Sequence, residues 1–474
     1  MSDTPTADPE SLAERMGDFS PRLSPMLVKE LRQGMRTNMF AIAFILLHTF
    51  MMLCLLTAMI DPGSSDSEVF FWFVIIVVLL FVQPLRGFSA LSSEYQLNTM
   101  DLIHMTKLNG WRITLGKWAA LNAQGLLFLT GVLPYLVIRY FLGNVNFIVD
   151  LIALLMIGIG SALATAITIG CSGFPNILLR GVACIALAIL LSALGGYVSS
   201  ELLSSSAPRA LKWQFLGLMA LIGVFGCYYF LAFAASRISP LSENHATRKR
   251  LSALLAVALC FALSALQYDS EIILVVITTI LCIATVDALT EPLPVFTRVV
   301  QPFSKTVITR WLGLFLIPGW ISGLFFFLLS TGILATIFFF NEKARGNPHE
   351  LKNLLFVLST CNTVVFPLLI ISLFFPSHTG SRFTFALYML IQAIIGGITI
   401  MVSFIAAAIG RWEELTFSLA PLPSVLIVAY QRSELHNIQF LLIVPATTLV
   451  CVVVPLVRGR KSFGKFIKHM IRSK

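Results

Sequence analysis

Residues 93–117 read S-E-Y-Q-L-N-T-M-D-L-I-H-M-T-K-L-N-G-W-R-I-T-L-G-K and lie between two long apolar runs. The stretch contains no apolar run of its own, so we expect a short helix at a membrane face. Asn98 can cap the N-terminus of this helix, and Asp101 follows three residues on, near the positive end of the helix dipole. A helix this short is marginal alone, so another surface must pack against it.

Two stripes run along this predicted helix, one polar and one apolar, each at a spacing of three residues. Such a pattern is typical of an ordinary amphipathic loop helix between two membrane spans, and it is also what a docking helix needs. The polar stripe is Asp101, His104 and Lys107, and the apolar stripe is Leu102, Met105 and Leu108.

The stretch also carries a series of residues in a characteristic order: Glu94, Thr99, Leu102, Thr106, Leu108, Arg112, Gly116 and Lys117. This order resembles the first cytoplasmic loop of ABC-2 type transporter permeases, which often reads E-x-x-x-G-T, a hydrophobic run, T-P-L-S, and a G-K that opens the third transmembrane helix. Two positions depart from that pattern, because Asn98 stands where the family usually has Gly and Lys107 where it usually has Pro. The resemblance implies that the loop holds the coupling helix that docks on an ATPase subunit. The coupling candidates are those residues together with Asp101.

The composition predicts the class of protein. Of the 474 residues, 57% are hydrophobic and only 12% are charged, whereas a soluble domain has about 25% charged residues. Together with many long apolar runs, this indicates an all-α, polytopic, multi-pass protein of the cell membrane. The net charge of +10 fits membrane topology and anionic lipid, so we expect the bilayer and no nucleic acid as a partner.

No motif for catalysis, metal binding or cofactor binding stands out. The eight cysteines form no C-x-x-C and resemble buried apolar residues, and the seven histidines are scattered. The nearest text to a P-loop runs from Gly110 to Lys117, but its spacing is one residue too long and Trp118 replaces Ser or Thr. We therefore expect no enzyme and no directly bound cofactor, and any ATP would be bound by a separate subunit.

An amphipathic helix precedes the first span. Residues 1–23 are polar and are expected to form a disordered cytoplasmic tail. Ser24 can then cap the N-terminus of a helix, and Pro25 is a residue that suits the first helical position. Its apolar face would lie along the cytoplasmic leaflet, with its charged side chains among the lipid phosphates. The order of residues in this helix also resembles the N-terminal sequence of ABC-2 permeases. The charged residues of this interfacial helix are Lys29, Glu30, Arg32 and Arg36.

Apolar runs predict about twelve membrane spans. With both termini inside, about 25 of the 33 Lys and Arg residues fall in cytoplasmic segments, which supports an N-in, C-in topology. The expected spans are 38–60, 69–88, 113–142, 147–170, 177–203, 211–235, 251–267, 270–290, 313–340, 351–376, 382–409 and 438–457.

The chain divides in the middle. Residues 24–235 form the half that resembles an ABC-2 permease, an interfacial helix followed by six spans. Residues 236–250 are expected to be a basic cytoplasmic linker, 251–457 a second half of six helices, and 458–474 a basic cytoplasmic tail. The resemblance does not explain the second half.

Ionisable residues are rare within the expected spans. Asp287, Asp150, Arg139 and Glu201 all lie near span ends, which favours interfacial snorkelling over an ion-coupling site. This scarcity argues against a transporter driven by an ion gradient. Glu94 could anchor the end of the second span by pairing with a cation, for which Arg32, Arg36 and Arg112 are candidates.

The function expected from the sequence is that of a permease subunit of an ABC transporter, exporting an unidentified substrate with energy from a separate ATPase subunit. A second copy of the permease is a further candidate partner. Two alternatives remain open: an ATP-independent secondary transporter or channel, and a membrane-embedded scaffold or enzyme.

Overall fold

The computed structural model describes most of the expected membrane helices. The described residues are 25–60, 65–96, 109–142, 147–174, 176–177, 180–182, 184–185, 209–240, 243–264, 270–293, 297–303, 305–345, 350–376, 379–381, 384–409, 438–460 and 464. The predicted tail 1–23 and most of 458–474 lie outside this part of the chain.

Every regular element within the described residues is a helix. The first group is α2 (Pro25–Met35), α3 (Asn38–Ile60), α4 (Ser65–Ile76), η1 (Val77–Val82), α5 (Gln83–Leu85), η2 (Arg86–Ser89), α6 (Ser92–Gln96), α8 (Gly110–Leu142), α9 (Phe147–Ser172) and α11 (Arg209–Ile238). The second group is α12 (Ala246–Ser264), α13 (Ser270–Thr290), α14 (Thr297–Val300), η3 (Gln301–Phe303), α15 (Val307–Leu316), α16 (Trp320–Arg345), α17 (Glu350–Phe374), α18 (Thr384–Ile409) and α21 (Ile438–Arg458).

Nine helical stretches in the described part of the chain are long and apolar enough to cross a membrane. They indicate a multi-pass membrane protein and agree with nine of the expected spans in position. Of the other three, 177–203 lies mostly outside the described residues. Expected span 438–457 corresponds to α21, whose apolar portion, Leu442–Arg458, is shorter. The remaining span, 251–267, corresponds to α12, which begins at Ala246 and carries the basic residues Arg248, Lys249 and Arg250 near its start.

One expected span is broken in two. Residues 313–340 were expected to form a single helix, but α15 ends at Leu316 and α16 begins at Trp320. Gly319 lies between them with a φ of 129°, a backbone conformation that favours glycine. Pro318 precedes it and supplies no amide hydrogen for a continuous helix. The described spanning helix therefore starts at Trp320.

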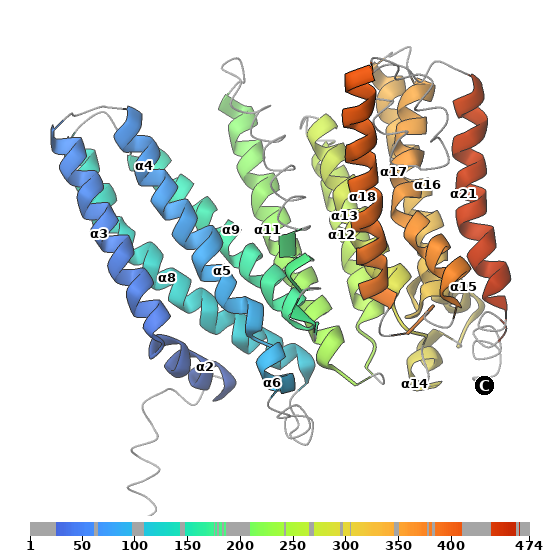
Figure 1. Cartoon of the computed structure of the whole chain (residues 1–474), viewed down its shortest axis with the longest axis horizontal. Coiled ribbons are helices and arrows are strands. Elements are labelled where there is room, and N and C mark those ends of the chain that lie inside the picture. The colour runs from blue at the N-terminus through green and yellow to red at the C-terminus, as the bar shows by residue number, and fades with distance from the viewer. Residues whose placement is uncertain are drawn as a thin grey trace, which may run out of the picture. The chain divides into compact units, whose positions relative to one another are not determined.

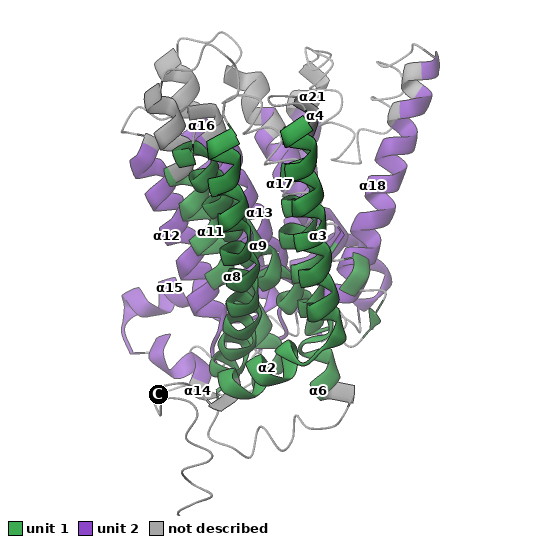
Figure 2. Ribbon diagram, turned by 90° about the vertical axis from the view of Figure 1, so that its left-hand side faces the viewer, with its two compact units in different colours: residues 1–184, 215–239 green, residues 185–214, 240–474 purple. Residues whose placement is uncertain are grey.

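The chain forms two compact units, coloured separately in Figure 2. Unit 1 comprises residues 1–184 and 215–239, and unit 2 comprises 185–214 and 240–474. The division after Ser239 falls in the expected linker 236–250. Within that stretch, however, the residues from Ala246 onward already belong to α12.

The core of unit 1 lies between α3, α4 and α8. It is built from large apolar side chains that these helices turn toward one another, among them Leu47, Met51, Phe71, Ile75, Phe128 and Val132. Figure 1 shows α2 at the lower end of α3, the end at which α6 also lies. We call this the α2 end of unit 1.

The second span of unit 1 is irregular near that end. It passes from α4 through the π-helical stretch η1 into α5 and the 3-10 turn η2. The amide of Gln83 donates to Val78 O, five residues back, and the next residue, Pro84, has no amide hydrogen to donate. Such π-helical turns are rare and frequently mark functional positions.

Unit 2 is packed around α13, which contacts α12, α16 and α17. The helices α13 and α16 approach so closely that a Cβ at Gly323 would collide with the backbone carbonyl of Ala288. Trp320, at the start of α16, is almost fully buried. This tight contact fixes the position of the α15–α16 connection against the end of α13.

Candidate functional site

A buried lysine lies between two carboxylates at the α2 end of unit 1. The Nζ atom of Lys117 is 2.7 Å from Oε1 of Glu30 and 3.1 Å from Oε1 of Glu94. The three side chains are 4%, 21% and 10% exposed, respectively. We call Glu30, Glu94 and Lys117 the Lys117 triad.

The triad joins three elements that are distant in sequence. Glu30 comes from α2, Glu94 from α6 at the end of the second span, and Lys117 from the start of α8. Buried charges are stable only when they are paired and hydrogen-bonded, and loss of one partner leaves the others uncompensated. The two ion pairs of Lys117 therefore hold α2, α6 and α8 together.

Further polar contacts fasten the same end of the second span. Arg86 donates from Nη2 to Gly34 O at 2.9 Å, which ties η2 to α2. Arg180 donates from Nη1 to Phe88 O at 3.2 Å and to Ser92 Oγ. These contacts hold the stretch just before residue 97 from more than one side.

The residues predicted as coupling candidates fall into two groups. Glu94 and Lys117 meet in the triad, Gly116 is buried beside Lys117, and Arg112 is exposed on the first turn of α8. The others, Thr99, Asp101, Leu102, Thr106 and Leu108, lie outside the described residues.

The predicted interfacial helix is present as α2 and begins at Pro25, as expected. Lys29, Arg32 and Arg36 are exposed, as an interfacial role requires. Glu30 differs, because it turns inward to Lys117. Sequence reasoning missed this pairing and considered only arginines as the cation beside Glu94. Glu94 and Lys117 both belong to the series of residues that resembles the ABC-2 loop. This was the only signal in the sequence that connected them.

A second buried charge network lies in unit 2. Lys249 Nζ is 2.5 Å from Asp287 Oδ2 and 2.9 Å from Glu291 Oε1, and Arg250 Nη2 is 2.7 Å from Glu291 Oε2. All four residues are less than a tenth exposed. We call these four residues the Lys249 network, and it contains two cations and two anions.

Arg250 extends the Lys249 network to the α15–α16 connection. Its Nη1 atom donates to Phe315 O at 2.8 Å, Ile317 O at 3.0 Å and Ser322 Oγ at 2.6 Å. Burial raises the pKa of the Glu291 carboxyl, but the positive charges of Lys249 and Arg250 outweigh it, so that the pKa lies below its ordinary value.

These contacts correct the sequence interpretation of several charged residues. Asp287 was expected to snorkel at the membrane interface, but it is 5% exposed and paired with Lys249. Arg139 and Asp150 are also buried, and their closest charged atoms lie 3.8 Å apart. Lys249 and Arg250, at the end of the expected linker 236–250, are buried and belong to α12. Their interactions depend on folding and could not be inferred from position in the sequence.

The described residues contain no group of three or more His, Cys, Asp and Glu side chains placed to hold a metal ion. The two charge networks instead consist of closely paired lysines, arginines and carboxylates. Their chemistry is that of holding helices together, and neither contains an activated nucleophile.

Comparison with known proteins adds no assignment. No family model, no curated protein and no solved structure matches this chain. The functional conclusion therefore rests on the apolar helices, the Lys117 triad and the sequence pattern around it.

Proposed function

We propose that this protein is the membrane-spanning permease subunit of an ABC transporter, and that it exports a substrate with energy from a separate ATPase subunit. The observation that carries the proposal is the Lys117 triad. It brings together Glu94 and Lys117, which flank the segment that resembles the family's coupling helix. The chain before that segment and the chain after it thereby meet in one buried ion pair.

The triad suggests how force would pass into the membrane. When the ATPase subunits close, they push on the coupling segment between Thr99 and Leu108. Because Glu94 and Lys117 are ion-paired, the second span and α8 move together, and Glu30 moves α2 with them. The π-helical stretch Val77–Val82 supplies a place where the second span can bend.

The surface at the α2 end has the charge expected of a cytoplasmic face. Lys29, Arg32, Arg36 and Arg112 are all exposed there. Basic residues are retained on the cytoplasmic side of membranes, where anionic lipids attract them. In our proposal this end faces the cytosol, where an ATPase subunit can reach the coupling segment.

A secondary transporter is the second candidate, because the Lys249 network places two carboxylates, Asp287 and Glu291, in a buried site. Buried carboxylates of this kind can bind protons or cations. Two cations already balance the two carboxylates, however, so no negative charge remains for a transported ion. Substrate flux that follows a proton or sodium gradient without ATP would favour this candidate.

Purification in mild detergent tests the proposal directly. We expect a stoichiometric subunit with a P-loop to accompany the chain, and we expect its ATPase activity to depend on the permease. If the chain is purified repeatedly without any ATP-binding partner while its fold is intact, the ABC assignment is wrong.

Inversion of the polar stripe tests the coupling segment itself. We expect Asp101→Arg combined with Lys107→Glu to leave membrane insertion intact and to abolish stimulation of the ATPase, because both charges on the docking face are reversed. Lys305→Glu, an exposed change in unit 2, is the control and is expected to leave stimulation unchanged. Unchanged stimulation in the double variant would count against this segment as the docking element.

A further inference from the structure

The ten-residue helix α15 of unit 2 turns its apolar side outward. Four large apolar side chains project from one face, and each is between 49% and 74% exposed: Val307, Ile308, Trp311 and Leu312. The opposite side of α15 is packed, because Gly313 is buried and a Cβ on it would meet Phe303 of η3. We call the four exposed residues the α15 face.

The backbone at both ends of α15 is hydrogen-bonded within the protein. At the N-terminus, the amide of Thr309 donates to the Thr306 hydroxyl at 3.2 Å, and the amide of Thr306 donates to the Thr309 hydroxyl at 3.0 Å. At the C-terminus, the Thr247 hydroxyl donates to Leu316 O at 2.8 Å, and Arg250 donates to the preceding carbonyl. A helix capped in this way can lie against an apolar environment with few unpaired backbone groups.

The position of α15 in the chain places it at a membrane face. A helix of ten residues is about 15 Å long, whereas the hydrocarbon core of a bilayer is about 30 Å thick, so α15 is too short to cross. Only residues 317–319 separate it from Trp320, where a helix long and apolar enough to span the membrane begins. The turn at Gly319 lets the chain change direction there. The helix α15 therefore lies at the level of the end of a span.

The α15 face adjoins another exposed apolar surface of unit 2. The helix α12 packs against the candidate span in α13 and exposes a row of leucines, one turn apart: Leu251, Leu255 and Leu259. In a multi-pass membrane protein, such a row faces the acyl chains of the lipids. The row begins directly after Arg250, which is bonded to α15. Figure 2 shows α15 below the label of α12, in unit 2. The lipid-facing surface of α12 thus reaches α15.

We infer that α15 is a second interfacial helix, which lies along one leaflet of the bilayer with the α15 face among the upper acyl chains. The face fits a lipid surface, because its side chains carry a single polar group, the indole N–H of Trp311, and tryptophan is enriched at membrane interfaces. A protein partner would call for more hydrogen-bonding groups at the edge of the face. This inference concerns unit 2 alone and does not depend on the transport function.

Spin labels on introduced cysteines test this placement in the full chain, reconstituted in dioleoyl phosphatidylcholine vesicles. Ile308→Cys and Leu312→Cys report on the α15 face, and the parent chain, with its native cysteines, supplies the background. Collisions of the label with oxygen, which dissolves among the acyl chains, are compared with collisions with a nickel chelate, which stays in water. We expect oxygen collisions to dominate at both positions.

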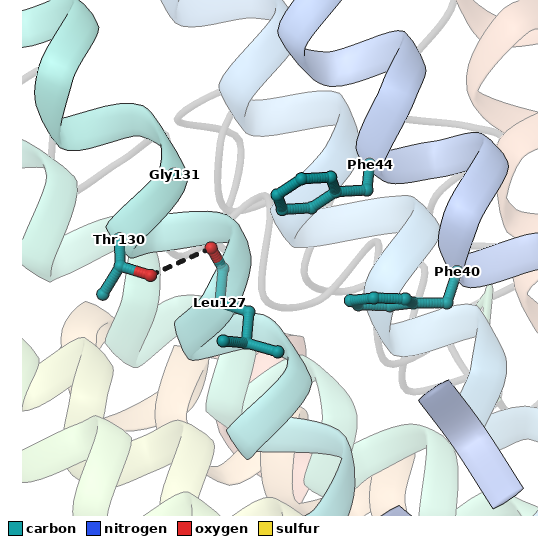
Figure 3. A pocket seen from close by; sticks show the side chains of 5 residues that line it. All are labelled: Phe40, Phe44, Leu127, Thr130 and Gly131. Atoms are coloured by element: carbon teal, nitrogen blue, oxygen red, sulfur yellow. Dashed lines mark hydrogen bonds between the residues drawn. The ribbon is translucent and has the colours of Figure 1, made fainter. Parts of the chain in front are cut away.

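Leu126→Cys supplies the reference for a deep position. Leu126 is exposed near the middle of the span in α8. The next residue, Leu127, is less suitable, because it lines an open hollow of about 300 Å³ between α3 and α8, where Phe40 and Phe44 would shelter a label (Figure 3). We expect the ratio of oxygen to nickel collisions to be highest at Leu126→Cys and lower at the two α15 positions, which lie nearer the headgroups.

Three results would overturn the inference. A collision ratio on α15 as high as at Leu126→Cys would make α15 part of a span. Dominant nickel collisions would place the α15 face in water. Few collisions with either reagent would mean that protein covers the face.

Trp311→Glu tests the contribution of the tryptophan. Because Trp311 is 66% exposed, this change removes little packing within the protein, and its effect depends on what covers the face. We expect nickel collisions at Leu312→Cys to rise at least about twofold, since a carboxylate is unfavourable among acyl chains. Lys305→Glu, an exposed change just before α15, is the matched control and should leave them unchanged. The same accessibility in both variants would show that Trp311 does not hold α15 in the leaflet.

Discussion

Lys117 is the residue on which the geometry of the α2 end depends. It is the cation between Glu30 and Glu94, and it is 4% exposed. A charge in such a place is stable only because both carboxylates compensate its loss of hydration. The same pair of carboxylates would repel one another without it, so the lysine determines whether α2 and α6 can approach α8.

We expect Lys117→Met to destabilise unit 1 strongly. Breaking a buried ion pair by removing one partner costs about 3–5 kcal/mol, and here two carboxylates lose their partner. Thermal unfolding in detergent should show a clearly lower midpoint for Lys117→Met than for Lys29→Met, in which an exposed lysine of α2 is removed instead. Equal midpoints for the two variants would mean that the triad does not stabilise the unit.

The pH dependence of stability should reflect two residues of unit 2. Burial lowers the pKa of His245 from its usual value, although Glu243 at 2.9 Å opposes this effect. The unfolded chain therefore binds a proton more readily, and stability should decrease as the pH falls below about 6.5. Glu291 has a lowered pKa, so its contribution is complete above about pH 4.3 and is lost as the pH falls further.

Variants assign these two pH ranges. The unfolding midpoint, measured between pH 8 and pH 2, should lose its upper decrease in His245→Gln and its lower decrease in Glu291→Gln. A His245→Gln protein with an unchanged profile between pH 7 and pH 5.5 would contradict the role given to His245.

At the scale of elements, the helix contacts most sensitive to substitution are those that require a glycine. A Cβ at Gly323 in α16 would meet the backbone of Ala288 and Leu289 in α13, and backbone cannot give way as a side chain can. Gly332, farther along α16, has no atom within 4 Å of the position of its missing Cβ. The two glycines therefore form a matched pair.

We expect Gly323→Ala to separate α13 from α16 and to destabilise unit 2 by about 1–3 kcal/mol, as overpacking typically does. Gly332→Ala should be neutral or slightly stabilising, because alanine favours a helix over glycine. Thermal unfolding of both variants checks this difference. A Gly323→Ala protein as stable as Gly332→Ala would show that the helices are not in close contact there.

The helices themselves were largely predictable from the sequence, because a long apolar run has few other structures available in a membrane. The amphipathic pattern of α2 was equally informative. The break before Trp320 was harder to predict, since the apolar run continues through Pro318 and Gly319. The charge pairs of Lys117 and Lys249 were not predictable, because their members lie far apart in the sequence and meet only after the helices pack.

At the scale of the whole molecule, each of the two compact units contains a lysine that bridges two carboxylates. In unit 1 the lysine is Lys117 of α8, and in unit 2 it is Lys249 of α12. Nine candidate spans in the described residues make the chain a multi-pass membrane protein. Its orientation in the membrane is an expectation from the basic residues, and the proposed function requires it.

The orientation can be measured with a cysteine introduced at Thr99, using a membrane-impermeant maleimide on intact cells and on inverted membrane vesicles. The parent chain, with its native cysteines, serves as the background control. We expect Thr99→Cys to be labelled in inverted vesicles only, because the proposed function requires the segment between the second span and α8 to face the cytosol. Labelling of Thr99→Cys in intact cells would place the segment outside and contradict a coupling role with a cytoplasmic ATPase.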